Sequence, residues 1–327
     1  MSIALALLLL LPLPAVQEES PDTLKQREDY ATYTEISEMT DPAARATAYM
    51  DFLEEGPHAT LVDFVVGNAL QDLQALTEAG NYDAVYPRAD RIAALRPEHA
   101  ATAGALALNA AAIAGHSEMI VKHGEPYYQA NPSPQIALIL ARAFNELDNQ
   151  ARMREYGQVA VSSGEFPMAE TWGISFEILR DHDGNGRKPQ AVAIARDLRS
   201  GLRSAPEGVD AATWRDIQIY LLDLIGTSDF QAERWREALA SFDAILALDG
   251  RNDKAWYFRG NSMLQLRTGV NDASVALGKA VVLNGSYATP ARTLLDRTAA
   301  SNAPPGAAAV SQFVERILAQ ARRELGL

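Results

Sequence analysis

The chain contains no cysteine, which excludes disulfide bridges, thiolate catalysis, cysteine-based zinc sites and the acylated cysteine of a bacterial lipoprotein. Long runs of alternating apolar and polar residues are also missing, so strands are unexpected and an all-helical chain is the natural interpretation. Basic residues are scarce, because 29 Lys and Arg stand against 42 Asp and Glu, for a net charge of -13. This balance argues against a general surface for nucleic acid or for anionic membranes.

An apolar run occupies residues 3–13 and is too short to cross a bilayer, which needs about 20 residues. A secretory signal needs only such a short core followed by a small residue, and Ala15 supplies that residue. We therefore predict a signal peptide over residues 1–17, cleaved after Ala15 or Gln17, although no Lys or Arg precedes the run. The mature protein is then exported, periplasmic or extracellular, without a membrane span. If the segment is not a signal, the protein is cytoplasmic.

A degenerate repeat of about 34 residues returns along most of the chain. Leu222 and Trp256 stand 34 residues apart, as do Gly226 and Gly260. Such a period indicates stacked helical hairpins, none of which can bury its apolar face alone. In the clearest unit, an apolar stripe at helical spacing predicts a first helix, residues 226–229 predict a turn, and residues 234–249 predict a second helix.

These units resemble the tetratricopeptide repeat, whose pattern sets a large residue, a small residue, alanine and an aromatic residue at fixed offsets. The matching residues are Leu222, Gly226, Trp235, Ala238 and Phe242 in one unit, and Trp256 and Gly260 in the next. The resemblance covers residues 60–285 and is closest over 212–285. It implies an all-α fold, an α-solenoid of antiparallel helical hairpins in a right-handed superhelix, with an atypical capping helix at the C-terminus.

The repeat also predicts how the chain is divided. Residues 18–57 are expected to form an N-terminal helical hairpin and residues 58–285 the repeats. The period fails after Gly285, so residues 286–327 are expected to be capping helices. No stretch has the composition of an interdomain linker, which favours one continuous superhelix.

One short segment suggests a metal site. Asp181, Asp183 and Asn185 have the alternate spacing of the oxygen ligands that open an EF-hand calcium loop, and Gly186 stands where that loop bends. The twelfth position, which should carry a glutamate, is Val192. The alternative interpretation is a long polar turn between two helices.

No catalytic constellation is visible in the sequence. The nucleophile elbow of hydrolases and the His-Glu-x-x-His zinc motif are both absent. His116 and His123 are seven residues apart and could share a helix face, but no third ligand falls at metal spacing, so we interpret them as a surface pair. We predict no enzymatic activity and no cofactor.

The resemblance implies where a ligand would bind. In tetratricopeptide-repeat proteins the first helix of each hairpin lines a concave groove. Carried onto this sequence, the residues facing the groove would be Arg142, Asn145 and Glu146 in one unit and Tyr257, Asn261 and Gln265 in a later one.

Three classes of function stay open at this point. The first is a non-enzymatic scaffold or adaptor that binds a protein or peptide in the cell envelope, through shape and polar complementarity along a rigid groove. The second is a periplasmic protein that binds a small ligand or glycan, which would require an apolar pocket with a few converging polar groups. The third is an enzyme that uses groove carboxylates. The sequence favours the first class.

Overall fold

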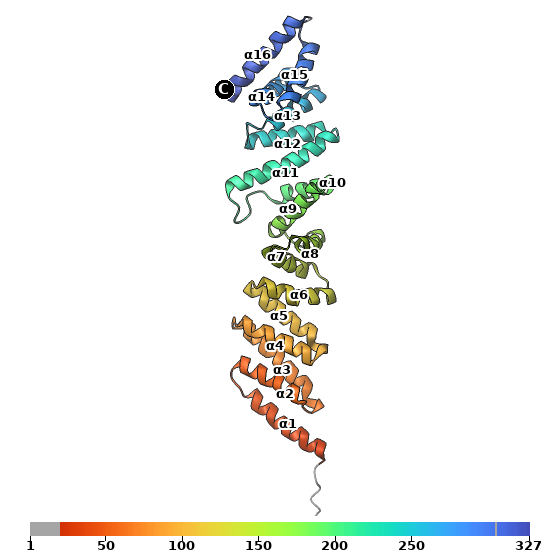
Figure 1. Cartoon of the computed structure of the whole chain (residues 1–327), viewed down its shortest axis with the longest axis vertical. Coiled ribbons are helices and arrows are strands. Elements are labelled where there is room, and N and C mark those ends of the chain that lie inside the picture. The colour runs from red at the N-terminus through yellow and green to blue at the C-terminus, as the bar shows by residue number, and fades with distance from the viewer. Residues whose placement is uncertain (1–19, 305) are drawn as a thin grey trace, which may run out of the picture. The chain divides into compact units, whose positions relative to one another are not determined.

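A computed structural model describes residues 20–304 and 306–327, so the predicted signal peptide lies outside the described residues. Within that part every regular element is a helix, and no strand occurs. The chain divides into two compact units, residues 1–150 and 151–327, and each is described here by itself. The helices are labelled along the chain in Figure 1.

Unit 1 is built from seven α-helices and one short 3-10 helix in its described part. Neighbours in sequence pack side by side, most closely α2 with α3, α4 with α5, and α5 with α6. The elements are α1 (Pro21–Ser37), α2 (Pro42–Glu55), α3 (Ala59–Glu78), α4 (Tyr82–Leu95), η1 (Pro97–His99), α5 (Ala100–Ala114), α6 (Ser117–Ala130) and α7 (Pro134–Glu146).

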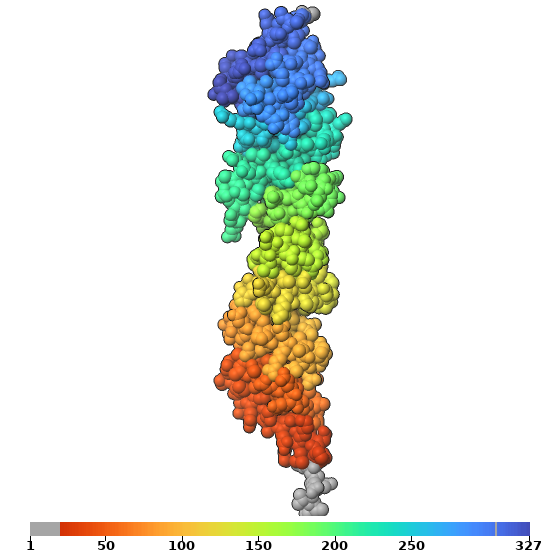
Figure 2. Space-filling view, viewed as in Figure 1, coloured from red at the N-terminus to blue at the C-terminus, as the bar shows by residue number. Residues whose placement is uncertain are grey.

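Unit 2 continues with helices that pack in the same way, most closely α9 with α10, α11 with α12, and α13 with α14. The residues that lead into α11 stand out from the surface of this unit (Figure 2). The elements are α8 (Gln150–Ser163), α9 (Met168–Gly184), α10 (Lys188–Gly201), α11 (Ala211–Gln231), α12 (Trp235–Leu248), α13 (Asp253–Gln265), α14 (Val270–Leu283), α15 (Ala288–Asn302) and α16 (Ala307–Leu325).

The same hydrogen bond closes the first helix of successive hairpins. At the end of α3 the N–H of Asn81 donates to the carbonyl of Leu76 at 2.8 Å, and equivalent bonds of 2.8–3.0 Å end α5, α9, α11 and α13. This Schellman geometry requires a left-handed residue just before the second helix. After α3 this left-handed residue is Gly80. After α11 and α13 it is a residue with a side chain, Glu233 or Arg267, with a positive φ of 59° or 56°. A repeated turn therefore reverses the chain in each hairpin.

The turn predicted over residues 226–229 is wrong, because α11 runs unbroken through it to Gln231. Gly226 instead lies where α11 meets α12: a Cβ there would come within 2.9 Å of the Ser241 Cβ. Gly260, 34 residues later, has the same role in α13, where a Cβ would lie 2.9 Å from the carbonyl oxygen of Ala273. Glycine at this position serves close helix packing, and the reversal comes at Glu233.

The apolar core of unit 2 consists of clusters that follow one another along the helices. One cluster joins α9, α10 and α11 around Leu179 and Leu198. The next joins α11, α12 and α13 around Phe242, and the last joins α13 and α14 to α15 and α16 around Leu277 and Ile317. Consecutive clusters share α11 and then α13. This is the all-α arrangement of antiparallel hairpins, with an atypical helix packed on the last one, that the resemblance implies.

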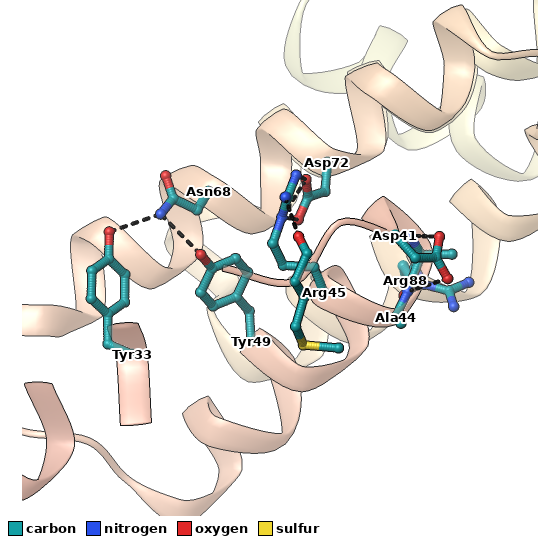
Figure 3. A network of polar contacts seen from close by, with 10 residues as sticks. Tyr33, Asp41, Ala44, Arg45, Tyr49, Asn68, Asp72 and Arg88 are labelled. Carbon is teal, nitrogen blue, oxygen red and sulfur yellow. Dashed lines mark hydrogen bonds and ion pairs between the residues drawn. The ribbon is translucent and has the colours of Figure 1, made fainter. Parts of the chain in front are cut away.

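Buried polar groups join the first three helices of unit 1 (Figure 3). Arg45 on α2 donates through Nε to both carboxylate oxygens of Asp72 on α3, at 3.1 and 3.0 Å, and through Nη1 to the carbonyl of Met39 at 2.6 Å. Asn68 donates to the hydroxyls of Tyr33 at 2.9 Å and Tyr49 at 3.2 Å. Asp72 is only 2% exposed, so Arg45 supplies the opposite charge that a buried carboxylate requires.

Candidate functional site

Unit 2 carries a cleft of about 420 Å³ between α10 and α11, which we call the α10–α11 cleft. The α10 side is lined by residues one turn apart, Lys188, Val192 and Arg196. The α11 side presents polar groups at the same spacing, Asp223, Thr227 and Gln231, and Lys254 at the start of α13 completes the lining. Three cations therefore surround one cleft, two placed by the helical periodicity of α10 and one by the start of α13.

Each of these cations has a carboxylate partner. The ammonium group of Lys254 lies 2.7 Å from Asp223, and Lys188 pairs with Asp183. Arg196 contacts Asp229 at 2.5 Å, but Arg234 also contacts Asp229, at 2.6 Å, and that carboxylate is 3% exposed. Two guanidinium groups share one carboxylate, so positive charge is in excess at the Arg196 end of the cleft.

A hydrogen bond behind the cleft holds Asp183 in its ionised form. The hydroxyl of Tyr220 on α11 donates to Asp183 at 2.9 Å. Burial and this carboxylate raise the pKa of Tyr220 well above its usual range. Burial opposes ionisation of Asp183, but the hydrogen bonds from Lys188 and Tyr220 prevail and lower its pKa. Asp183 therefore works as a fixed anion that orients Lys188.

A second cleft, of about 440 Å³, adjoins the first and is called here the α11–α13 cleft. Asp223 and Lys254 line both, so the two clefts form one groove across α10, α11 and α13. The second cleft adds Asp216 and Asp253, together with the ring of Tyr287. The groove thus has the cations Lys188 and Arg196 on its α10 side, the Asp223–Lys254 pair in both clefts, and the carboxylates of Asp216 on α11 and Asp253 on α13 in the second cleft.

One hydrogen-bonding group in the groove has no protein partner in the described residues. The hydroxyl oxygen of Thr227 is buried, and no group within the part of the chain that the structure describes bonds to it. Thr227 lines the α10–α11 cleft. A buried hydroxyl without a partner costs free energy, and because this oxygen has almost no accessible surface a ligand in the cleft would contact other atoms of Thr227.

The predicted groove residues Tyr257, Asn261 and Gln265 lie along one face of α13, at successive turns. Asn261 donates to the Tyr257 hydroxyl at 3.5 Å, and Gln265 donates to Asn261 at 3.4 Å. They do not line either cleft, but Asp223, Thr227 and Gln231, each 34 residues earlier, all do. Contact of Tyr257, Asn261 and Gln265 with a ligand stays a prediction.

The other predicted groove residues, Arg142, Asn145 and Glu146, are exposed on α7 of unit 1. Glu146 accepts a hydrogen bond from the Ser117 hydroxyl, and Asn145 accepts one from Gln150 at 3.5 Å. None of the three lines the clefts described in unit 2, and their contact with a ligand stays a prediction.

The residues of the predicted calcium loop are largely helical. Asp181 and Asp183 lie in the last turn of α9, and Asn185 caps it, so the polar turn is limited to residues 185–187. The Asp181 carboxylate pairs with Arg187 and lies 3.4 Å from Arg154. In the described residues, no cluster of three or more His, Asp or Glu side chains is placed to hold a metal ion. Calcium binding here stays a prediction.

His116 and His123 do not form a surface pair. His123 is 7% exposed and packs its ring against Tyr86 at 6.1 Å between centroids, whereas the His116 side chain is 44% exposed. The prediction was wrong because it considered only the residues of α6. Tyr86 on α4, a separate helix, packs on His123 and buries it. Burial lowers the pKa of His123 below its ordinary value.

We expect acid to destabilise unit 1 through His123. The folded state holds this imidazole neutral, so the unfolded state binds its proton at higher pH. Stability is then lost as pH falls through about 6.5, by up to about 1.4 kcal/mol between pH 7.5 and 5.5. Urea unfolding at both pH values should show a smaller loss for His123→Gln than for the unchanged protein, while His116→Gln should leave it unchanged. Equal losses in all three would contradict the assignment.

The described helices include none that is both long and apolar enough to traverse a membrane. No protein-family model matches the chain, and no curated protein matches it.

Three solved structures are similar to this chain. One is a tetratricopeptide repeat protein from Parabacteroides merdae (TM-score 0.30, 12% identity, 84% of this chain and 99% of that one). Another is the Cut9–Hcn1 hetero-tetramer of the APC/C (TM-score 0.29, 14% identity, 91% of this chain and 59% of that one). The third is the apo form of the quorum sensor NprR from B. thuringiensis (TM-score 0.31, 12% identity, 92% of this chain and 88% of that one). The chain spans 59% of the matched chain in the second of these. Within each unit, its own helices form antiparallel hairpins that pack in series, an all-α hairpin arrangement.

Proposed function

We propose that this protein is a non-enzymatic scaffold that binds a protein or peptide segment in the groove of unit 2. The observation that carries the proposal is that two adjoining clefts share Asp223 and Lys254 and differ in charge along their length. Opposite charges on a segment would fit such a groove in one direction only. Complementary charges favour the correct partner and the rate at which it binds.

The groove supplies what an extended segment needs. Its walls come from packed helices, so its polar groups are already in position before binding, which reduces the entropy lost on association. An acidic group of the segment would lie near Lys188 and Arg196, and a basic group near Asp216 and Asp253. Backbone amides and carbonyls of the segment would meet the side-chain amide of Gln231.

The absence of enzymatic activity is part of the same proposal. Two acidic groups of the groove region, Asp183 and Asp223, are held in ion pairs with Lys188 and Lys254. A general acid or base needs a pKa near the working pH, and the pKa of Asp183 is shifted in the opposite direction. These pairs favour positioning of charge over proton transfer.

We also propose that the scaffold works in the cell envelope, in the periplasm or outside the cell. The support is the apolar run at residues 3–13 with Ala15 after it. Mass spectrometry of the protein purified from its own organism should find a mature N-terminus after Ala15 or Gln17. An intact first residue in the cytoplasmic fraction would contradict export.

The groove is tested by selection from a display library of random linear peptides. We expect enriched peptides to carry an acidic residue and to bind less tightly as salt increases. The double substitution Lys188→Gln with Arg196→Gln should weaken them by about tenfold or more, measured by fluorescence anisotropy.

The matched control removes two exposed cations elsewhere in unit 2, Arg297→Gln with Arg322→Gln, and should leave affinity unchanged. This control changes the net charge of the protein by the same amount. A difference between the two variants therefore reports contacts in the groove and not the electrostatic field of the whole protein. Thermal unfolding of both variants reports whether the fold is retained. Equal weakening in the two variants, or enriched peptides without acidic residues, would reject the groove as the binding site.

A further inference from the structure

Unit 1 contains a cavity of about 470 Å³ between α4, α5 and α6, which the proposed function does not use. Its walls are made largely of very small side chains: Ala89 and Ala93 on α4, and Ala100, Ala101 and Gly104 on α5. Small residues at adjoining positions leave space that larger side chains would fill. The volume falls within the range of pockets that take small molecules, about 300–1,000 Å³.

Four polar side chains converge on one side of this cavity: Asp90, Lys122, His123 and Tyr127. The ammonium group of Lys122 contacts Asp90 Oδ2 at 2.6 Å. The other carboxylate oxygen, Oδ1, lies 3.9 Å from His123 Nδ1, which is too long for a direct hydrogen bond. Oδ1 therefore keeps its capacity to accept a hydrogen bond.

The histidine and the tyrosine complete the polar side of the cavity. His123 is more than nine-tenths buried, and its Nε2 has no partner within the described residues. Tyr127 is half-buried and lines the same cavity. Buried polar groups are normally paired, so Nε2 is an exception, but it has almost no accessible surface and a ligand in the cavity would contact other atoms of the ring.

The charges of the site define the ligand further. Lys122 and Asp90 neutralise one another, and burial keeps the imidazole neutral, so the cavity has no net charge to offer. A charged ligand would lose its hydration without a counter-ion to replace it. A purely apolar ligand would offer no hydrogen bond to Asp90 Oδ1 or to the Tyr127 hydroxyl.

We propose that this cavity binds an uncharged small molecule whose apolar body lies on the alanine walls and whose hydroxyl or amide group bonds Asp90 and Tyr127. A hydroxyl or amide N–H donates to Asp90 Oδ1, and its oxygen accepts from the Tyr127 hydroxyl. The site is independent of the groove in unit 2. It adds small-molecule recognition to a chain whose fold is that of a scaffold.

The test uses three probes of similar size: phenol, which has one hydroxyl; toluene, which has none; and benzoate, which is charged at neutral pH. The full chain, labelled with 15N at histidine, is titrated with each probe at pH 7.5. We expect phenol to shift the ring nitrogen signals of His123 with a Kd in the millimolar range. Toluene and benzoate should shift them at least tenfold more weakly.

A pair of adjacent substitutions on α4 locates the binding. Ala93 lines the cavity and its neighbour Ala94 is exposed outside it. Ala93→Leu should abolish the phenol shift, while Ala94→Leu should preserve it. Gly104→Leu gives a second filling variant, because a Cβ at Gly104 meets no atom within 4 Å. Thermal unfolding confirms that each variant is folded.

The remaining outcomes overturn the proposal. Absence of a phenol shift at His123 shows that the cavity does not bind this class of ligand. Equal shifts with toluene show that no hydrogen bond selects the ligand, and stronger shifts with benzoate show that the site prefers anions. A loss of binding that is the same in Ala93→Leu and Ala94→Leu places the ligand elsewhere.

Discussion

Replacing Asp72 by alanine is expected to lower the free energy of unfolding of unit 1 by about 3–5 kcal/mol. Asp72 is 2% exposed and accepts hydrogen bonds from Arg45 through both carboxylate oxygens. The same hydrogen bonds raise the pKa of Arg45, against the effect of its burial. Without the carboxylate, a guanidinium group is left between α2 and α3 with no counter-ion. Urea unfolding at pH 7.5, followed by circular dichroism, measures the loss.

Two further variants identify the cause of this loss. Asp51→Ala removes a carboxylate whose side chain is 58% exposed, and whose partner Arg91 keeps Glu54, so about 0–1 kcal/mol should be lost. The double variant Asp72→Ala with Arg45→Met removes both charges and should recover much of the stability. A loss below 1 kcal/mol for Asp72→Ala would show that Arg45 finds solvent or another partner.

The second large effect is expected at Phe242 in unit 2. Its side chain is completely buried and stacks on Phe258 at 5.0 Å between ring centroids, with the rings almost parallel. It also lies behind α11, where a Cβ on Gly226 would come within 3.2 Å of its ring. Phe242→Ala removes a whole ring from the middle of one apolar cluster, and we expect a loss of about 3–5 kcal/mol in unfolding free energy.

The matched control is the same substitution at Phe64, which is 64% exposed on α3. Phe64→Ala should change the unfolding free energy by less than about 0.5 kcal/mol. Hydrogen exchange of the Phe242→Ala variant should show lost protection in α11, α12 and α13, because these helices share the affected cluster. Comparable losses at both positions would mean that burial does not decide the effect.

The fold was predictable from sequence because its determinants are local and repeated. Gly226 and Gly260 mark the close approach of two helices, and residues matching at the 34-residue spacing mark the hairpins. The turn at residues 226–229 was misplaced because glycine permits both a turn and close packing, and only the partner helix distinguishes them. Ser241 and Phe242 on α12 lie so close to Gly226 that its role is close helix packing.

The polar sites were less predictable, because they depend on helices that meet from separate parts of the sequence. Lys188 and Lys254 line one cleft although they are far apart in the chain. His123 is buried by α4, which a reading of α6 alone does not include. The predicted series Tyr257, Asn261 and Gln265 lies on α13 and lines neither cleft, and its contact with a ligand stays a prediction.

The sharing of α11 and α13 between consecutive apolar clusters bears on how such an array can evolve. Each of these helices has two apolar faces, so it must have a neighbour on both sides. On α14 that place is taken by α16, whose Ile317 would lie 2.8 Å from a Cβ on Gly278. A further hairpin could not pack on this face of α14, because α16 already occupies it. Growth of the array is therefore expected by duplication of a hairpin such as α11–α12, which presents apolar faces on both sides.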